Sequence, residues 1–393
     1  MTAVRTQVGI IGAGPAGLAL ARLLERHGVE SVIVECRSRD YVEQRIRAGV
    51  LEQGSVELLT EAGVAGRLEK EGLVHTGISL QWGGERHRVP LDELTGGRSI
   101  VIYGQTEVVK DLIAARQQSG APLLFEVDDV VVTDLMSQRP RVSFSHGGQR
   151  MQLECDVVAG CDGSHGPCRG FIPDGVLRNY SREYPYGWLG ILAAVAPSND
   201  ELVYAHSERG FALLSMRSRA LSRLYVQCRP NDEIAAWPDA RVWEELHYRL
   251  GLPGWQLAEG PVLEKGITAM RSSVWEPMQW GNLYLAGDAA HIVPPTGAKG
   301  LNLALHDVRL LAEALVDLYA TGSRRGLDSY SERCLRRVWR CEHFSWWMTS
   351  MLHRAEGSSE FELKLQEAQL RYLATSRAAA ATLAENYVGL IDV

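Results

Sequence analysis

The feature that most constrains the fold is a glycine-rich turn near the start of the chain. Residues 12–17 read Gly-Ala-Gly-Pro-Ala-Gly. Residues 8–11 form a short apolar run typical of a buried strand, and residues 15–27 carry apolar side chains at helical spacing up to Gly28. Residues 31–35 have the pattern of a second strand. The order strand, turn, helix, strand predicts the first unit of a doubly wound parallel sheet.

The three glycines of this turn and the acid after it indicate a dinucleotide site. Gly12 permits the tight turn, Gly14 lets a pyrophosphate approach the backbone, and Gly17 lets helix and strand pack closely. The helix amino terminus then faces the phosphate. Glu35 ends the second strand where a carboxylate accepts hydrogen bonds from a ribose. A purely structural turn is the alternative, and the agreement of strand, helix and acid disfavours it.

Size, charge and cysteine usage limit the classes of function. A chain of 393 residues exceeds a single core, so two or three units are expected. The net charge of −7 offers no general attraction for nucleic acid or an anionic membrane. The apolar run over residues 8–24 is broken by glycines, Pro15 and Arg22, so no membrane span is expected. Seven cysteines without Cys-x-x-Cys spacing predict a reducing cytoplasm and no metal site.

The remaining pattern predicts a second sheet and a helical end. Strand candidates follow at residues 99–103, 123–127, 141–145 and 156–160, and 283–286 return to the first sheet. Runs at 187–195, 202–206, 211–217 and 223–227 follow one another closely, which favours a mixed or antiparallel sheet. Beyond residue 301, breaks near 322–326 and 357–359 predict three helical stretches. The expected class is α/β: a Rossmann-type domain, a second mixed or antiparallel β-sheet domain and a C-terminal helical region.

Two further acids distinguish this chain from a simple nicotinamide dehydrogenase, which needs only one fingerprint. Asp162-Gly163 follows one predicted strand and Gly287-Asp288 follows another. With the glycine turn, this ordered trio resembles the single-component flavin-dependent aromatic hydroxylases. The resemblance implies bound FAD, a ribityl contact for Asp288 and a joint FAD and donor role for Asp162. The family's usual serine four residues after the first acid is Gly166 here.

A proline-rich segment over residues 294–302 follows the second acid and opens onto a predicted helix. A helix amino terminus carries unpaired N–H groups and partial positive charge, which would stabilise an anionic reduced flavin ring at its pyrimidine end. A plain loop before a core helix is the alternative. The resemblance implies flavin-ring contacts for Leu301 and Asn302.

Further blocks resemble the family members that act on 4-hydroxybenzoate: residues 45–54, 103–107, 291–303, 344–350 and 385–390. The similarity spans nearly the whole chain and implies FAD contacts for Arg47 and Gln105. We expect a discontinuous FAD-binding domain at residues 1–72, 99–179 and 268–322. A substrate domain is expected at 73–98 and 180–267. Residues 323–393 are expected to form a helical interface region of a homodimer.

A carboxylate clamp is predicted from strand spacing. Ser215 and Arg217 fall on one face of a strand because side chains alternate. A short connection favours a hairpin that brings Tyr225 near Ser215, with the register left open. Arginine presents a fork that matches a carboxylate, which favours an aromatic acid. A surface hairpin with an ordinary arginine is the alternative, but the family binds the benzoate carboxylate at these positions.

The resemblance implies conversion of 4-hydroxybenzoate to 3,4-dihydroxybenzoate with O2 and NADH or NADPH, through a flavin hydroperoxide. A phenol with a pKa of about 10 is mostly protonated at neutral pH, so the enzyme must help remove its proton. The resemblance implies that Tyr204 receives it and passes it to Tyr387, with His75 as the solvent-side end, where a pKa near neutrality suits release. The Pro295 carbonyl would orient the ring. Taken singly, these are ordinary core tyrosines and a surface histidine.

The nicotinamide donor has no second glycine fingerprint in the sequence. Four residues match donor-binding surface positions of the family, although each also fits a solvated charge: Arg45, His165, Arg169 and Arg271. Cys36 stands where NADPH-using members have a basic residue, while Arg37 and Tyr41 remain nearby. This pattern favours NADH or mixed use.

Three other functions remain open from the sequence. A related flavin hydroxylase of another phenolic acid would share every motif. A nicotinamide dehydrogenase would explain the glycine turn but not the second acid or the prolines. A noncatalytic flavin-binding module would act through partner contacts at Trp346 and Trp347, which more simply pack a helix or a homodimer contact.

Overall fold

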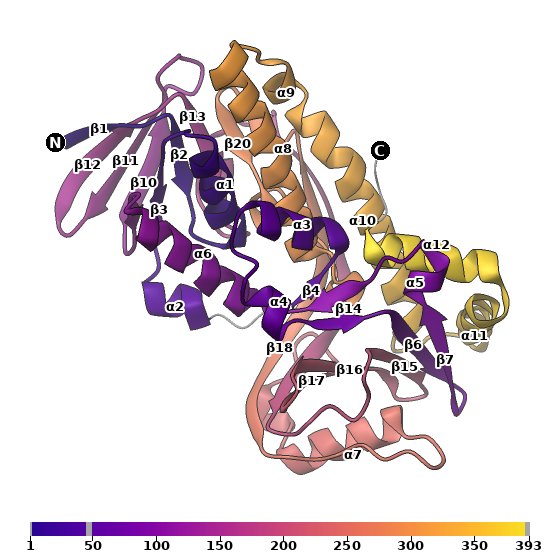
Figure 1. The fold of residues 1–393 in the computed structure, drawn as a ribbon. Helices are drawn as coiled ribbons and strands as arrows, with labels where there is room; N and C mark the ends of the chain where they lie inside the picture. The colour runs from indigo at the N-terminus through magenta and orange to yellow at the C-terminus, as the bar shows by residue number, and fades with distance from the viewer. Residues whose placement is uncertain (1, 45–48, 390–393) are drawn as a thin grey trace.

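The computed structural model describes residues 2–44 and 49–389 as a mixed α/β molecule (Figure 1). Within these residues the strands form four sheets, of which a six-stranded and an eight-stranded sheet organise the molecule. This arrangement confirms the predicted α/β class.

The six-stranded sheet has the order β19-β20-β13-β2-β3-β9. Its strands are β2 (Val8–Ile11), β3 (Ser31–Val34), β9 (Leu123–Leu124), β13 (Val157–Gly160), β19 (Gln279–Trp280) and β20 (Leu283–Leu285). All neighbours are parallel except β19 and β20. Every residue of β2, β3, β13 and β20 is buried, as expected for a parallel sheet covered on both faces. Because these strands are neighbours, the segments that follow β2, β13 and β20 meet at one edge.

Three helices pack with this sheet: α1 (Pro15–Arg26), α6 (Gln105–Ser119) and α8 (Gly300–Thr321). Helix α1 lies between the other two and contacts both (Figure 1). Its start has proline in the first turn, where a missing N–H costs nothing, and its end is followed by Gly28 with φ of 70°. The predicted strand–helix–strand unit is therefore confirmed.

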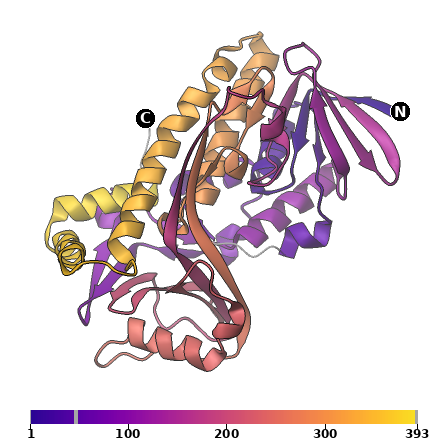
Figure 2. The same cartoon turned by 180° about the vertical axis from the view of Figure 1, so that it is seen from behind.

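The eight-stranded sheet has the order β21-β18-β14-β17-β16-β15-β6-β7. Its strands are β6 (Gly77–Trp82), β7 (Glu85–Pro90), β14 (Arg178–Ala193), β15 (Val203–Ser207), β16 (Gly210–Ser218), β17 (Leu221–Cys228), β18 (Val262–Glu276) and β21 (His291–Ile292). Only β15 and β6 pair in parallel, so the predicted mixed sheet is confirmed. The long antiparallel pair β14 and β18 runs between the two halves of the molecule (Figure 2). Helix α7 (Asp239–Leu250) packs against β15, β16 and β17.

Two smaller sheets complete the described strands. One contains β1 (Thr2–Arg5), β10 (Asp128–Thr133), β11 (Arg141–His146) and β12 (Gln149–Glu154); the other contains β4 (Val50–Leu51), β5 (Leu73–His75) and β8 (Ile100–Ile102). The prediction of one strand over residues 123–127 is wrong in extent. Glu126 adopts φ of 58°, which interrupts the extended backbone between β9 and β10.

The carboxyl-terminal part is helical and contains one more long helix than predicted. After α9 (Arg325–Asp328) and α10 (Tyr330–Leu352), the last stretch divides into α11 (Glu360–Thr375) and α12 (Arg377–Val388). Ser376 ends α11 and caps α12 by accepting from the Ala379 N–H, a break without glycine or proline to announce it. No helix in the described part of the chain is long and apolar enough to cross a membrane.

Short helices connect these elements. They are α2 (Arg39–Gln44), α3 (Gln53–Glu61), α4 (Leu68–Glu71), α5 (Leu91–Leu94), η1 (Cys168–Phe171), η2 (Ile234–Ala236), η3 (Gly287–Ala289) and η4 (Pro295–Gly297). Elements η3 and η4 matter most for the site, because they lie between β20 and the start of α8.

Candidate active site

The glycine turn after β2 is fixed by close backbone contacts. Gly12 has φ of 107°, and a Cβ placed there would lie 2.3 Å from the Cys161 carbonyl oxygen. A Cβ at Gly17 would lie 2.0 Å from the Gly12 carbonyl oxygen. A Cβ at Gly14, in contrast, meets no atom within 4 Å. Two glycines therefore close the turn, and the third leaves its outer side open to a ligand.

Glu35 fastens this turn to the end of β3. Its side chain is 8% exposed and accepts hydrogen bonds from the N–H groups of Ala13, at 2.7 Å, and Arg37, at 2.8 Å. Helix α1 begins without a side-chain cap and without an acidic residue in its first turn. Its first N–H groups therefore lack helical partners beside the open turn, an arrangement that suits an anion.

The Asp-Gly turn lies next to the glycine turn, at the end of β13. One Asp162 oxygen accepts from the Cys168 N–H at 2.7 Å, and the other is buried without a partner among the described residues. Burial raises the pKa of this carboxyl. A Cβ at position 166 would lie 2.1 Å from the Asp162 carboxyl carbon. Glycine in place of the family's usual serine therefore gives the carboxyl group the position it takes here.

The Gly-Asp turn follows β20 and is held in place by the buried pair of Asp307 and His291. Asp307 accepts from the Gly287 N–H at 2.9 Å and contacts the His291 ring at 2.6 Å. Asp288 itself is exposed at the same edge. Arg169 joins this turn to the Asp-Gly turn by donating to the carbonyls of Ala289, at 2.7 Å, and Ser164, at 2.5 Å.

The start of α8 faces the same edge. The Asn302 side chain accepts from the Glu52 N–H at 3.0 Å and the Ser55 hydroxyl at 2.7 Å, and it donates to the carbonyls of Val50 and Ala298. These four bonds occupy the Asn302 side chain. The backbone N–H groups of Asn302 and of half-buried Leu301, in the first turn of α8, remain available to a ligand. Gln105 starts α6 and is half-buried.

Tyr204 on β15 and Tyr387 on α12 meet inside the second sheet's core. Each is 1% exposed, and their hydroxyl oxygens lie 2.6 Å apart although 183 residues separate them in the chain. Their rings are edge to face, with centroids 6.1 Å apart. Burial raises the pKa of both phenols, so both stay neutral at ordinary pH. The structure thus joins two of the predicted residues directly.

His75 differs from its prediction. Its side chain is 1% exposed, and its Nε2 lies 2.8 Å from the Met216 sulfur. Its Nδ1 has no partner among the described residues. Burial lowers the pKa of His75 to about 4. The expectation of a solvent-side group with a near-neutral pKa is therefore wrong, because β16 covers this end of β5.

The structure fixes the register of the hairpin that carries the predicted clamp, which the sequence left open, with an irregularity between Met216 and Ser218. Ser215 pairs with Arg223, whereas Tyr225 pairs with Leu213 and is a diagonal neighbour of Ser215 on the same face. Arg223 donates to the Tyr225 hydroxyl at 3.2 Å, and its Nη1 is buried without a partner among the described residues. Arg223 was not predicted, although strand alternation places it on the face of Tyr225.

Arg217 extends the clamp towards α6. It donates to the Thr106 hydroxyl near the helix start. Burial, together with the nearby charge of Arg223, lowers the pKa of Arg217. Two guanidinium groups thus lie close together in one half-buried place, and their donor forks suit an anionic group such as a carboxylate.

The structure describes three of the predicted donor residues: His165, Arg169 and Arg271. Arg45, like Arg47, lies outside the described residues. His165 and Arg271 are exposed, whereas the Arg169 guanidinium is engaged between the two acid-bearing turns. A cavity of about 400 Å³ lies at the end of β3; its lining is Cys36, Arg37, Ser38, Tyr41, Glu126 and Asp128.

A buried ion cluster at the start of α8 was also missed. Lys299 is 1% exposed and donates to Glu52 at 2.5 Å and to the carbonyls of Asn386, at 2.6 Å, and Tyr387, at 3.0 Å. Arg337 binds the other Glu52 oxygen. The cluster ties α12, and with it the Tyr387 phenol, to the segment that follows η4. Lys299 stands in the proline-rich segment, but its partners lie 87 to 247 residues away, so spacing gave no signal.

Comparison with known proteins agrees with this geometry. The family model described as FAD binding domain matches residues 5–345. The p-hydroxybenzoate hydroxylase of Acinetobacter baylyi is 53% identical over 391 residues, which cover 99% of this chain and 96% of that protein. The chain belongs to the p-hydroxybenzoate hydroxylase family. It is thereby an FAD-dependent aromatic monooxygenase.

Proteins outside the p-hydroxybenzoate hydroxylases resemble this chain at lower sequence identity. The p-nitrophenol 4-monooxygenase structure from Pseudomonas putida superposes with a TM-score of 0.84 at 19% identity and covers 99% of both chains. A 3-(3-hydroxy-phenyl)propionate/3-hydroxycinnamic acid hydroxylase of Burkholderia cenocepacia is 25% identical over 84% of this chain and 60% of its own length. The first likeness concerns the fold alone.

The described residues fit FAD, the cofactor of the p-hydroxybenzoate hydroxylase family. Open space beside Gly14 and the uncapped start of α1 suit a pyrophosphate. Two acceptors lie along the same edge: the buried Asp162 oxygen that has no partner within residues 2–44 and 49–389, and the exposed carboxylate of Asp288. Such acceptors match the hydroxyl groups of a ribityl chain.

Proposed function

We propose that this protein hydroxylates 4-hydroxybenzoate to 3,4-dihydroxybenzoate, using FAD, O2 and NADH or NADPH. The observation that carries the proposal is the buried hydrogen bond of 2.6 Å between Tyr387 and Tyr204, and Tyr204 lies on the sheet that also bears the arginine clamp. A phenol relay and an anion clamp in one core fit a substrate with a hydroxyl at one end and a carboxylate at the other.

The clamp binds the carboxylate in this proposal. Arg217 supplies a charge-assisted fork, and Ser215 and Tyr225 supply hydroxyl donors from the same sheet face. Arg223, which donates to the Tyr225 hydroxyl, adds a second positive charge and orients that phenol. The clamp thereby selects a phenolic acid over an uncharged phenol.

The relay handles the phenolic proton. FAD, when bound, would supply an electrophilic oxygen atom that derives from O2. Tyr204 accepts the substrate proton while donating its own to Tyr387, so neither buried phenol has to ionise. His75 stays the predicted next member of the relay: its Nδ1 has no partner among the described residues, and its lowered pKa means that it passes the proton on rather than holding it. The resulting phenolate ring is richer in electrons at the carbon beside the oxygen.

Residues around the two sites are assigned as follows. The Pro295 carbonyl orients the substrate ring, and the N–H groups of Leu301 and Asn302 contact the flavin ring. The proposed nucleotide and ribityl contacts are Gly12, Gly14, Gly17, Glu35, Arg47, Gln105, Asp162 and Asp288. The division into an FAD domain, a substrate domain and a carboxyl-terminal interface region, with the boundaries given above, is part of this proposal.

NADH is the proposed preferred donor. Glu126 and Asp128 line the cavity beside Cys36, and their charges repel the 2′-phosphate of NADPH. Arg45, His165, Arg169 and Arg271 stay predicted donor contacts. Cys36→Arg should lower the KM for NADPH relative to NADH, and Cys36→Ser is the matched control. An unchanged KM ratio would contradict this assignment.

A homodimer through α11 is proposed. Phe361, Leu365 and Tyr372 form an apolar stripe on this helix and are 71%, 54% and 59% exposed. An antiparallel second copy, with its two-fold axis between residues 366 and 367, places Phe361 opposite Tyr372. A cytoplasmic location stays a prediction of the sequence.

Sedimentation tests this interface. The double variant Phe361→Ser, Tyr372→Ser should be monomeric, because both ends of the stripe lose their apolar contact. Met136→Ser changes a side chain that is 73% exposed elsewhere and should leave the dimer intact. A wild-type monomer, or a dimeric double variant, would contradict the interface.

One assay tests the function as a whole. The purified protein should be yellow, and 4-hydroxybenzoate should accelerate donor oxidation with 3,4-dihydroxybenzoate as the product by chromatography. Without O2, turnover should stop after one reduction of the flavin, whereas a dehydrogenase would continue. A panel of other phenolic acids distinguishes a related hydroxylase. Peroxide as the sole product, or no response to any phenolic acid, would overturn the proposal.

A further inference from the structure

A chain of buried hydrogen bonds starts beside Pro295 and runs away from it through α10. The Thr349 hydroxyl donates to the Thr296 hydroxyl at 2.8 Å, and both side chains are fully buried. The Thr349 carbonyl lies 3.0 Å from Nδ1 of His353. Nε2 of that histidine accepts from the Trp188 indole at 2.6 Å. The chain thus crosses from η4 to β14 through one turn of a helix.

The direction of each bond follows from the donors available. An indole N–H can only donate, so Nε2 of His353 carries no proton. The neutral ring then has its proton on Nδ1, which donates to the Thr349 carbonyl. Burial lowers the pKa of His353 to about 3, which keeps this tautomer across the working pH range. The hydrogen-bond directions along these residues are therefore fixed, with each donor facing an acceptor.

The far end of the chain reaches the carboxylate clamp. The Trp188 ring centroid lies 4.8 Å from that of Tyr225. Phe211 stacks between Trp188, at 5.1 Å, and His353, at 4.4 Å, and also contacts the Tyr204 ring. The chain thereby spans from the clamp to the proline whose carbonyl is proposed to orient the substrate ring, and Phe211 links it to Tyr204.

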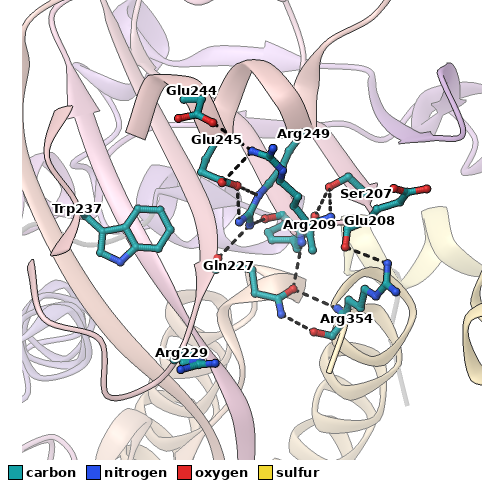
Figure 3. A network of polar contacts seen from close by, with 12 residues as sticks. Ser207, Glu208, Arg209, Gln227, Arg229, Trp237, Glu244, Glu245, Arg249 and Arg354 are labelled. Atoms are coloured by element: carbon teal, nitrogen blue, oxygen red, sulfur yellow. Dashed lines mark hydrogen bonds and ion pairs between the residues drawn. The ribbon is translucent and has the colours of Figure 1, made fainter. Parts of the chain in front are cut away.

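The histidine is held from its other side as well. Gln227 on β17 donates to the Arg354 carbonyl at 2.6 Å and accepts from the Arg354 N–H at 3.1 Å, as Figure 3 shows. The same Gln227 oxygen accepts from the Phe211 N–H at 3.0 Å. The residue after His353 is therefore fastened to the sheet that carries the clamp. This second attachment fixes the end of α10 against β16 and β17.

We propose that Trp188, His353, Thr349 and Thr296 form a positioning chain that sets the distance between the carboxylate clamp and Pro295. The inference rests on the proposed function, because it assumes that the substrate bridges these two points. Its physical reason is that a ring held by its carboxylate must present one carbon to the reacting oxygen, so a small shift of η4 misplaces that carbon. When the ring is misplaced, the donor is still oxidised, but O2 is released as hydrogen peroxide instead of hydroxylating the substrate.

Variants of Thr349 test the chain. Thr349→Val removes the hydroxyl at nearly constant volume and should lower the dihydroxy product formed per donor oxidised by about fivefold, the effect of one hydrogen bond. Thr349→Ser keeps the hydroxyl and should restore wild-type coupling. Ser345→Ala is the matched control, because it removes a buried hydroxyl of the same helix that has no partner among the described residues. FAD content and melting temperature of each variant exclude a folding defect.

The outcomes separate the two proposals. Wild-type coupling in Thr349→Val, or equal uncoupling in Ser345→Ala, would overturn the positioning chain while the hydroxylase function stands. A wild type that forms no dihydroxy product fails the function instead. In that case the positioning chain is tested by nitrogen-15 NMR of histidine-labelled protein, a measurement that needs no substrate. His353 should show a protonated Nδ1 and a bare Nε2 at every pH from 6 to 9; a protonated Nε2 would refute the chain.

Discussion

Two regions of this protein differ in the kind of contact that forms them. The nucleotide edge is the proposed FAD site at the ends of β2, β13 and β20, and the substrate core is the proposed substrate site between β15, β16, β17 and α12. At the nucleotide edge, backbone meets backbone: Gly12 and Gly17 leave no room for a Cβ, and α1 offers N–H groups. In the substrate core, side chains from separate elements meet, as Tyr204 on β15 meets Tyr387 on α12. The first site depends on sterics that follow from adjacent residues, and the second on packing between distant ones.

This difference teaches where each site should be sensitive. A backbone site has no intermediate state, because one added methyl group either fits or collides. A side-chain site loses function in steps, since each hydroxyl or guanidinium group contributes its own share. Substitutions at the nucleotide edge should therefore act on cofactor content, and substitutions in the core on rate, affinity and pH dependence.

The largest effect is expected at Gly17. Gly17→Ala would place its Cβ 2.0 Å from the Gly12 carbonyl oxygen, so the turn must open and FAD should be lost. The measurement is flavin absorbance per chain after gel filtration. Gly66→Ala is the control, because Gly66 lies outside the glycine turn and its Cβ meets no atom within 4 Å, so the free energy of unfolding should change by less than about 1 kcal/mol. One bound flavin per chain in Gly17→Ala would contradict the claim that the nucleotide edge depends on close backbone contacts.

Next in size is the loss of the relay. Tyr387→Phe removes the partner of the Tyr204 hydroxyl, and kcat should fall by about 100-fold, a usual contribution of proton transfer. The deficit should shrink as pH approaches about 10, where the substrate phenol ionises unaided. Tyr330→Phe, which loses a buried bond to the Leu285 carbonyl near the nucleotide edge, should keep the wild-type pH profile. A Tyr387→Phe deficit that does not change with pH would contradict the relay.

A smaller, purely ground-state effect is expected at the clamp. Arg217→Met should raise the Kd for 4-hydroxybenzoate by roughly 30-fold to 150-fold, since a charge-assisted pair contributes about 2–3 kcal/mol. The flavin spectrum on titration reports the binding. Arg219→Met changes an exposed arginine of the same hairpin and should bind normally. Loss of flavin from the Arg217 variant would show that the two sites are not separable.

The smallest effect is a pH dependence of stability in the substrate half. Burial lowers the pKa of His75 to about 4 and that of His353 to about 3, below the unfolded value of 6.5. The unfolded chain therefore binds more protons below pH 6.5, and stability should fall as pH drops through that window, by roughly 2 kcal/mol per histidine at pH 5. Urea unfolding at pH 7 and pH 5 measures it. His75→Gln should flatten the slope, and a slope equal to wild type would contradict this origin.

The sequence predicted the nucleotide half well because its signals are local. Four buried strand residues, a glycine turn and an amphipathic helix specify one another within about thirty positions, as in any βαβ unit. The helical end was predicted less well, because Ser376 divides α11 from α12 by capping rather than by glycine or proline. Capping by a lone serine depends on the backbone turn around it, which spacing does not reveal.

The sequence by itself determined the family of the fold and its cofactor chemistry. Parallel apolar strands force the ends of β2, β13 and β20 to one edge, so the glycine turn, Asp162 and Asp288 had to meet there. Only the tertiary structure decided the register that brings Arg223 to the clamp and the covering of His75 by Met216. The same holds for the chain from Thr296 to Trp188. The physical reason is that contacts between elements follow from how whole faces pack, and no periodicity along one segment encodes its distant neighbour.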